Sequence, residues 1–289
     1  MVQRQQDRRD APVFIGGAGR SGTTLLRVML NAHPHLCSGP EFKLLPAVAN
    51  LYQQTLVQQD IMKAYSLERS DISASFALLV ERFFEKFRVQ SNASRVVEKT
   101  PHNVLIMNEL GDMFPKAKFI HVIRDGRDVV NSLRKMNWTG IDGNKLWYVE
   151  DVLNAATYWV QVVSKALQDA ESPQLKDRVK VVRYEELVDE PMKTMQQVLA
   201  FLDEPWSDDV LNHTRVKRGY EPEESSTVQV NEKIHKRATG KWVNEFTRDD
   251  LSAFEHVAGH LLVQLGYEPN HEWVQAHQRM AGFQHASRE

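Results

Sequence analysis

The sequence predicts an α/β fold in which helices cover a central parallel sheet. Short apolar runs alternate with segments of helical periodicity, and strands separated by helices indicate a parallel sheet with crossover connections. The expected strands are residues 12–16, 96–97, 118–123 and 179–183. No linker divides the chain, so we expect a single domain over residues 11–270, flanked by tails at 1–10 and 271–289.

The expected helices follow from apolar residues that recur at helical spacing. They are residues 23–32, 73–88, 103–113, 127–135, 146–170, 191–202 and 248–265. The region from about 43 to 90 predicts a helical insertion that covers the site. Residues 219–240 are polar and irregular, and we expect a C-terminal lid loop there, because long loops inside compact domains are usually functional.

Composition narrows the class of protein and its surroundings. The 289 residues include 36 basic and 38 acidic side chains, for a net charge of −2, which excludes a general electrostatic footprint for nucleic acid or an anionic membrane. The single Cys37 excludes an intrachain disulfide and favours a reducing compartment. No apolar run has the length of a membrane span, and the polar first ten residues lack the core of a signal peptide. We therefore expect a cytoplasmic protein with no membrane or nucleic-acid partner.

The first expected strand runs into a glycine-rich segment, G-G-A-G-R-S-G-T-T, at residues 16–24. Glycines let the backbone approach an anion, and free N–H groups at the start of the next helix point at it. Thr23 and Thr24 add hydroxyl donors, and Arg20 adds a planar charged fork suited to oxyanions. The glycine spacing matches the start of a P-loop, but Thr23 takes the place of its lysine. The segment therefore predicts a phosphate cradle without the lysine that ATP-hydrolysing enzymes use on the β- and γ-phosphates.

A second group of anion donors, R-D-G-R-D-V-V-N-S, occupies residues 124–132 after another expected strand. An arginine at a strand end, with a serine eight residues later, could hold a further phosphate across the first turns of a helix. Taken alone, Arg124 and Arg127 are equally compatible with surface ion pairs to Asp125 or Asp128.

Together, the two segments resemble the cofactor signature of sulfotransferases that use 3′-phosphoadenosine 5′-phosphosulfate (PAPS) and release the bisphosphate PAP. In that family an R/K-S-G-T-T loop holds the 5′-phosphosulfate, and an R-[DN]-[GP]-R-x-x-x-x-S segment holds the 3′-phosphate. The resemblance implies a P-loop NTPase-like three-layer fold. The implied cofactor contacts are Arg20, Ser21, Gly22, Thr23 and Thr24 in the first segment, and Arg124 and Ser132 in the second. Arg20, in place of a lysine, is similar to the membrane-bound Golgi branches of the family.

More of the chain resembles one branch, the protein-tyrosine sulfotransferases. The similar segments are R-S-G-T-T-L-L-R-V-M-L-N-A-H-P from Arg20, R-Y-E-E-L-V at 183–188, and K-W at 241–242 followed by L-G-Y-E-P at 265–269. The resemblance runs from about Val13 to Pro269 and is poor in the helical insertion. It implies that Tyr184 and Lys241 also contact the cofactor. Dimers occur in that branch, which leaves a homodimer open for this chain.

Sulfuryl transfer needs a base for the acceptor hydroxyl and cations for the departing phosphate. Glu41 falls on the position of the branch's catalytic base, although Pro40 replaces a glutamate before it. Lys99 falls on a family lysine that contacts the bridging oxygen. His102 is a rival base, because cytosolic members use a histidine near this lysine, displaced here by one residue. The other histidines show no metal-ligand spacing, so no metal is expected.

Two further groups of residues bear on the site. The resemblance assigns Ser226, in the expected lid, to the cofactor and the departing oxygen, and the adjacent Ser225 leaves the register open by one. Four aromatic residues on the expected middle helix could line an acceptor pocket, although core packing is the simpler interpretation: Trp147, Tyr148, Tyr158 and Trp159.

The sequence thus predicts an enzyme that moves a sulfuryl group from PAPS to an acceptor hydroxyl. Its expected catalytic residues are Glu41, Lys99, Ser226 and Arg20. The alternatives are a P-loop nucleotide or small-molecule kinase, against which the missing loop lysine argues, and a non-catalytic nucleotide-binding or scaffold protein. The acceptor stays open among a peptide tyrosine, a sugar, a lipid and a natural product.

Overall fold

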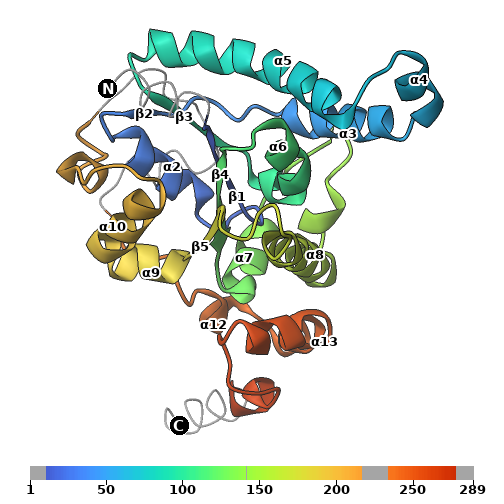
Figure 1. Cartoon of the computed structure of the whole chain (residues 1–289). Helices are drawn as coiled ribbons and strands as arrows, with labels where there is room; N and C mark the ends of the chain where they lie inside the picture. The colour runs from blue at the N-terminus through green and yellow to red at the C-terminus, as the bar shows by residue number, and fades with distance from the viewer. Residues whose placement is uncertain (1–10, 141, 217–233, 278–289) are drawn as a thin grey trace, which may run out of the picture. The chain divides into compact units, whose positions relative to one another are not determined.

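The computed structural model describes residues 11–140, 142–216 and 234–277, and it confirms the α/β class (Figure 1). Five strands form one sheet in the order β2-β3-β1-β4-β5, and every neighbouring pair is parallel. They are β1 Val13–Gly16, β2 Leu36–Cys37, β3 Arg95–Lys99, β4 Lys118–Ile123 and β5 Val179–Arg183. The two-residue β2 was not among the expected strands, because so short a run carries no periodicity.

The chain divides into two compact units. The sheet unit comprises Met1–Gly17, Gly22–Ile123 and Lys165–His235 and contains all five strands. The helical unit comprises Ala18–Ser21, Arg124–Ser164 and Lys236–Glu289. The expected single domain over residues 11–270 stays a prediction.

The core of the sheet unit lies around the central strand β1, which is buried along its whole length. In register, Phe14 lies beside Glu98 of β3 and Phe119 of β4. The Phe14 ring also packs within 6.2 Å of the Phe84 ring and 5.7 Å of the Phe114 ring, measured between centroids. Phe84 belongs to α5 (Arg69–Gln90) and Phe114 follows α6 (Met107–Met113), so these helices cover the Phe14 face of the sheet.

The opposite side of the sheet carries α2 (Thr23–Asn31), α9 (Tyr184–Asp189) and α10 (Pro191–Phe201) (Figure 1). Leu26, Met29 and Leu30 of α2 are fully buried, as the helical spacing predicts. Helix α9 begins directly after β5, without an intervening loop, and this short helix was not among the expected elements.

The insertion between β2 and β3 is helical, as expected, and consists of α3 (Leu45–Leu56), α4 (Gln59–Ala64) and α5. Tyr52 of α3 packs edge-on against Phe76 of α5 and donates its hydroxyl to Asp112 at 2.9 Å. A capping box between Glu68 and Asp71 starts α5 at Arg69, so this helix is longer than the amphipathic stretch at 73–88. The helix expected at 103–113 is instead a 3₁₀ turn, η1 (Pro101–Leu105), followed by α6.

The helical unit is built around a buried arginine. Its elements are α7 (Gly126–Leu133), η2 (Trp147–Val149), the part of α8 (Val152–Ala170) up to Ser164, α12 (Trp242–Glu245) and α13 (Arg248–Gln264). The Arg127 guanidinium lies 3.9 Å from the ring centre of Trp242 and 4.8 Å from that of Trp273, and it pairs with Asp125 and Glu268. This stack ties α7 to the C-terminal helices of the unit. One further short turn, η3 (Asp208–Val210), lies in the sheet unit.

Candidate active site

The loop after β1 needs glycine where the sheet unit crowds it. Gly17 donates its N–H to the carbonyl oxygen of Pro101 at 2.9 Å. Gly22 precedes α2 with φ +94, in the left-handed region, and a Cβ added there would overlap the ring of Tyr184. Tyr184 is therefore packed against the loop, as expected of a residue close to the anion site, and no side chain other than hydrogen fits at Gly22.

Helix α2 supplies the donors expected of a phosphate cradle. It begins at Thr23 directly after the loop, no acidic residue lies in its first turn, and both Thr23 and Thr24 are buried there. The unpaired N–H groups of a helix start and its dipole favour an anion. Ser21, assigned to the helical unit, is fully buried, and its hydroxyl oxygen has no hydrogen-bond partner among the described residues.

In the helical unit, three of the expected phosphate contacts come together. Arg20 has φ +72, and its Nε donates to the Ser132 hydroxyl at 3.0 Å. Arg124 Nη1 donates to the carbonyl oxygen of Arg20 at 3.0 Å, and its Nη2 donates to the carbonyl oxygen of Ala238. Asp128 lies 3.7 Å from Arg124 Nη2 and accepts from the Gly240 N–H at 2.7 Å. Arg20 lies 112 positions from Ser132 and 104 positions from Arg124 in the sequence, so segments far apart in the chain form this cationic cluster.

Other cations of this segment have acidic or aromatic partners. Arg127 is held in the aromatic stack, so the second arginine of the R-D-G-R string is structural. Arg134 pairs with Asp250 at 2.8 Å, and Lys135 pairs with Glu245. Arg127 pairs with Asp125, as the ion-pair interpretation predicts, but this pair is buried and does not lie on the surface.

In the sheet unit, the structure brings together the expected base and the expected lysine. Lys99 Nζ lies 2.6 Å from Glu41 Oε1 at the end of β3. The Lys99 side chain is 1% exposed and that of Glu41 is 23% exposed. The rival base, His102, follows in η1, where burial lowers its pKa and the charge of Glu41 partly opposes that shift. A charged lysine so deeply buried is tolerated because the carboxylate accompanies it.

The four aromatic residues divide between core and surface. The helix expected at 146–170 is interrupted, so Trp147 and Tyr148 lie in η2, whereas Tyr158 and Trp159 lie in α8. Trp159 is fully buried, as core packing predicts, whereas Trp147 is 43% exposed. Tyr158 accepts a hydrogen bond from the Gly19 N–H at 3.1 Å and stacks on Tyr148 at 4.2 Å between ring centres. Burial raises the pKa of Tyr158, so its hydroxyl stays protonated beside the loop. The sequence pattern did not indicate this contact with the loop.

Two expected cofactor contacts belong to the segment expected to form a lid, residues 219–240, or directly follow it. Ser226, like its neighbour Ser225, lies outside the described residues. Lys241 is exposed and directly precedes α12. Their roles stay predictions.

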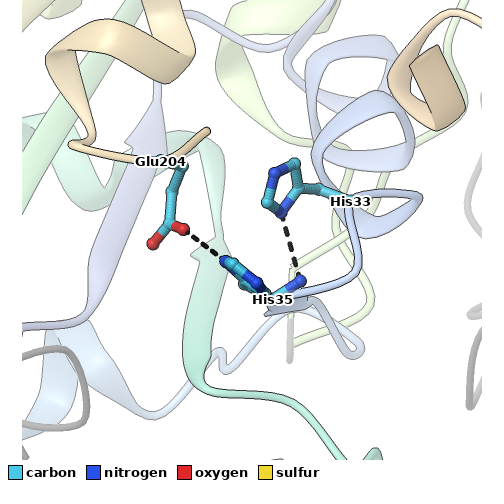
Figure 2. A group of neighbouring side chains, drawn as sticks. All are labelled: His33, His35 and Glu204. Atoms are coloured by element: carbon cyan, nitrogen blue, oxygen red, sulfur yellow. Dashed lines mark hydrogen bonds and ion pairs between the residues drawn. The ribbon is translucent and has the colours of Figure 1, made fainter. Parts of the chain in front are cut away.

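A second cluster of the sheet unit joins His33, His35 and Glu204, which are possible metal ligands by type and lie within 4.8 Å of one another (Figure 2). The His33 Nδ1 accepts from the His35 backbone N–H at 3.1 Å, and its Nε2 lies 2.9 Å from the Pro205 carbonyl oxygen. Because a carbonyl only accepts, Nε2 carries the proton and both ring nitrogens of His33 are engaged. The His35 Nδ1 pairs with Glu204 at 2.9 Å. These contacts favour a structural cluster over a metal centre.

Comparison with known proteins places these residues in a family context. The model of the sulfotransferase family matches residues 12–208. The chain is 33% identical to protein-tyrosine sulfotransferase A of Caenorhabditis elegans over 266 residues, which cover 89% of this chain and 67% of that protein.

Solved structures agree in fold. The sulfotransferase domain of the olefin synthase of Synechococcus PCC 7002 aligns with a TM-score of 0.56 at 22% identity, covering 86% of this chain and 94% of that domain. A mouse sulfotransferase, solved in complex with PAP, aligns with a TM-score of 0.53 at 15% identity, covering 93% and 89%.

The expected cytoplasmic location is wrong. The nematode relative belongs to the tyrosine-sulfating branch, one of the Golgi branches named above, so the compartment does not follow from a single cysteine. Among the described residues, no helix combines the length and apolar character needed to cross a membrane.

The glycine-rich loop after β1, the parallel sheet that carries it, and the match over residues 12–208 lead to one conclusion. The chain belongs to the sulfotransferase family, with its P-loop-like fold, and is a sulfotransferase that uses PAPS as the sulfuryl donor.

Proposed function

We propose that the acceptor is a tyrosine hydroxyl of a peptide, and that Glu41 and Lys99 carry out the chemistry. The name of the nematode relative supports the acceptor class. The observation that carries the residue roles is the 2.6 Å contact between Lys99 Nζ and Glu41 Oε1, which puts a carboxylate and an ammonium at one strand end. Next to Glu41, the Phe42 ring packs 5.0 Å from the half-exposed Phe83 ring, which offers an apolar surface to a phenol.

In the proposed reaction, Glu41 takes the proton of the phenol while the phenol oxygen forms a bond to the sulfur of PAPS. The bond between that sulfur and the bridging oxygen breaks, and its electrons stay on the 5′-phosphate of PAP. Once Glu41 is protonated, it no longer holds Lys99 by charge, and the ammonium can stabilise the departing oxygen. Proton transfer to the base and release of the lysine are therefore coupled through the ion pair.

Donor binding is proposed to use both groups of anion donors. Arg20, Ser21, Gly22, Thr23 and Thr24 would hold the 5′-phosphosulfate. Arg124 and Ser132 would hold the 3′-phosphate, and Tyr184, Ser226 and Lys241 would add contacts, with Ser226 also at the departing oxygen. Arginine and lysine side chains carry the charge in this scheme, so no metal ion is required.

The nucleotide site is tested by thermal unfolding. PAP at saturating concentration is expected to raise the melting temperature by several degrees, because a ligand at 100 times its Kd stabilises the folded state by about 2.7 kcal/mol. ATP with magnesium is expected to give no comparable shift, since the loop lacks the lysine for a γ-phosphate. Stabilisation by ATP-magnesium alone would contradict the proposed site.

The base is tested by substitution. Glu41→Gln should keep the PAP-induced shift and lower kcat for a tyrosine peptide by about 10²- to 10⁴-fold, the usual contribution of a positioned base. His102→Gln, measured beside it, separates the two candidate bases. A larger loss of kcat in His102→Gln than in Glu41→Gln would assign the base to His102. Transfer to a sugar but to no tyrosine peptide would overturn the proposed acceptor class.

A further inference from the structure

A buried carboxylate, Glu98, lies directly before Lys99 in β3 and is 4% exposed. Glu98 pairs in register with Phe14, and Lys99 pairs with Ile15. Neighbouring residues of a strand point to opposite faces, so Glu98 lies on the Phe14 face while Lys99 lies on the other. The Glu98 side chain therefore lies on the face of the sheet opposite to the Lys99 side chain.

Hydrogen bonds link Glu98 to the segments on either side of the catalytic pair. Its Oε1 accepts from the backbone N–H of Phe42 at 2.9 Å and from the Thr100 hydroxyl at 2.7 Å. Phe42 is the residue after Glu41, and Thr100 is the residue after Lys99. One oxygen atom thus fixes the two neighbours of the candidate base and the candidate lysine.

The second oxygen of Glu98 connects the same unit to the phosphate loop. Oε2 accepts from the side-chain amide of Asn103, and that amide also donates to the carbonyl oxygen of Ile15 at 3.2 Å. Ile15 lies one residue before the glycine-rich loop begins. Glu98 therefore joins the ends of β1 and β3 and the segment that carries Glu41.

The partners of Glu98 suit an ionised carboxylate. A backbone N–H and an amide NH₂ can only donate, and a hydroxyl can donate, so both oxygens act as acceptors. Burial raises the pKa of Glu98 above its usual range, and the bonds from Thr100, Phe42 and Asn103 offset that rise only in part. Each donor lost from a buried carboxylate leaves part of its desolvation cost uncompensated, so such a carboxylate holds its donors in fixed positions.

We propose that Glu98 is a positioning residue for sulfuryl transfer, which holds Glu41 and Lys99 in register with each other. This inference rests on the proposed roles of Glu41 and Lys99. A displacement of about 1 Å at a reacting group can lower a rate about 100-fold. Loss of the bond from Phe42 would let the segment with Glu41 move relative to β3, while the nucleotide loop keeps its own contacts.

The test is Glu98→Gln, which keeps the shape but replaces one acceptor oxygen by a donor. In either orientation of the new side-chain amide, its NH₂ group faces the Phe42 N–H or the Asn103 NH₂, so two donors meet without an acceptor. We expect kcat for a tyrosine peptide to fall about 10- to 100-fold, with the KM for PAPS and the Kd of PAP changed less than about 3-fold. Rates are measured at least 15 °C below the melting temperature of each variant.

The readout that separates positioning from loss of structure is the acidity of the acceptor. A peptide with tetrafluorotyrosine is already ionised near neutral pH and does not need the base. The defect of Glu98→Gln should therefore shrink with this peptide, as it should in Glu41→Gln. A defect that is equal with both peptides, or a kcat equal to that of the wild type, would overturn the proposal.

Glu204→Gln is the matched control, because it makes the same change at another buried carboxylate of the sheet unit, which pairs with His35 and lies 3.7 Å from Arg95. It should lower the melting temperature without changing kcat for either peptide. If Glu98→Gln does not fold, Thr100→Val removes one donor to Oε1 and should give the same acceptor-dependent defect, about 3- to 10-fold. Absence of PAPS-dependent transfer in the wild type would instead reject the proposed function itself.

Discussion

Lys99 is both charged and deeply buried, a combination that is costly for the stability of a folded protein. Its side chain is 1% exposed, yet an ammonium is costly to bury unless an anion accompanies it. Glu41, 58 positions earlier in the sequence, supplies that anion. Each residue was a candidate from its own place in the sequence, but only the fold makes them partners.

His121 leads to a prediction about pH. It lies in β4, is fully buried, and neither of its ring nitrogens has a hydrogen-bond partner among the described residues. Burial lowers its pKa from 6.5 to about 3. Between about pH 3 and pH 6.5, His121 is protonated in the unfolded chain and neutral in the folded chain. The free energy of unfolding therefore falls as the pH drops below about 6.5. The contribution of this group is about 1.4 kcal/mol per pH unit.

Urea unfolding between pH 5.0 and 7.5 measures this contribution. His121→Leu should remove it, so the decline of the unfolding free energy toward pH 5 should be shallower than in the wild type by about 1.4 kcal/mol per unit. Equal slopes for the two proteins would contradict the buried neutral histidine.

At the scale of elements, the connection between β1 and α2 contains a glycine that no other residue can replace without a shift. Gly22 has φ +94, and any Cβ there would overlap the Tyr184 ring. Gly22→Ala should therefore shift the loop or the ring, lower the melting temperature and abolish most of the stabilisation by PAP. Thermal unfolding with and without PAP measures both effects.

Gly143 provides the control for that substitution. It also has a positive φ, +78, but no atom lies within 4 Å of a Cβ built there. Gly143→Ala should cost only about 1 kcal/mol for the left-handed backbone and leave the PAP shift intact. A normal PAP shift in Gly22→Ala would show that the crowding at Tyr184 does not shape the loop.

The sequence predicted elements with a long periodic pattern and missed elements that are short. The ranges expected for β4 and β5 are those of the structure, and α13 differs by one residue at its end. By contrast, β2 has two residues and α9 follows β5 without a break, so neither gave a separate signal. Pro101 starts a 3₁₀ turn because proline suits a first helical position. Ile106, with φ −126 and ψ 24, is not helical and separates this turn from α6, so the expected helix at 103–113 is divided.

For the whole molecule, the parallel class of the sheet followed from the alternation of strands and helices. The order of the strands did not, because it depends on pairings between distant segments. The contacts of Glu98 also needed the fold, because R-V-V-E-K has three charged residues and its sequence does not show that all five are buried. The compartment was misjudged because composition alone carries little information about it.

The sheet order has a consequence for how the chain acquires its structure. The strand at the centre, β1, is made first, but its neighbours β3 and β4 begin about 80 and 105 residues later. At a synthesis rate of about 5–20 residues per second, Val13, Phe14 and Ile15 emerge many seconds before the strands that bury them. Folding must therefore close long loops before it gains sheet contacts, which slows it and leaves an apolar strand exposed on the nascent chain. The sheet order that places β1 between β3 and β4 thus leaves residues 13–15 to be synthesised well before the strands that protect them from solvent.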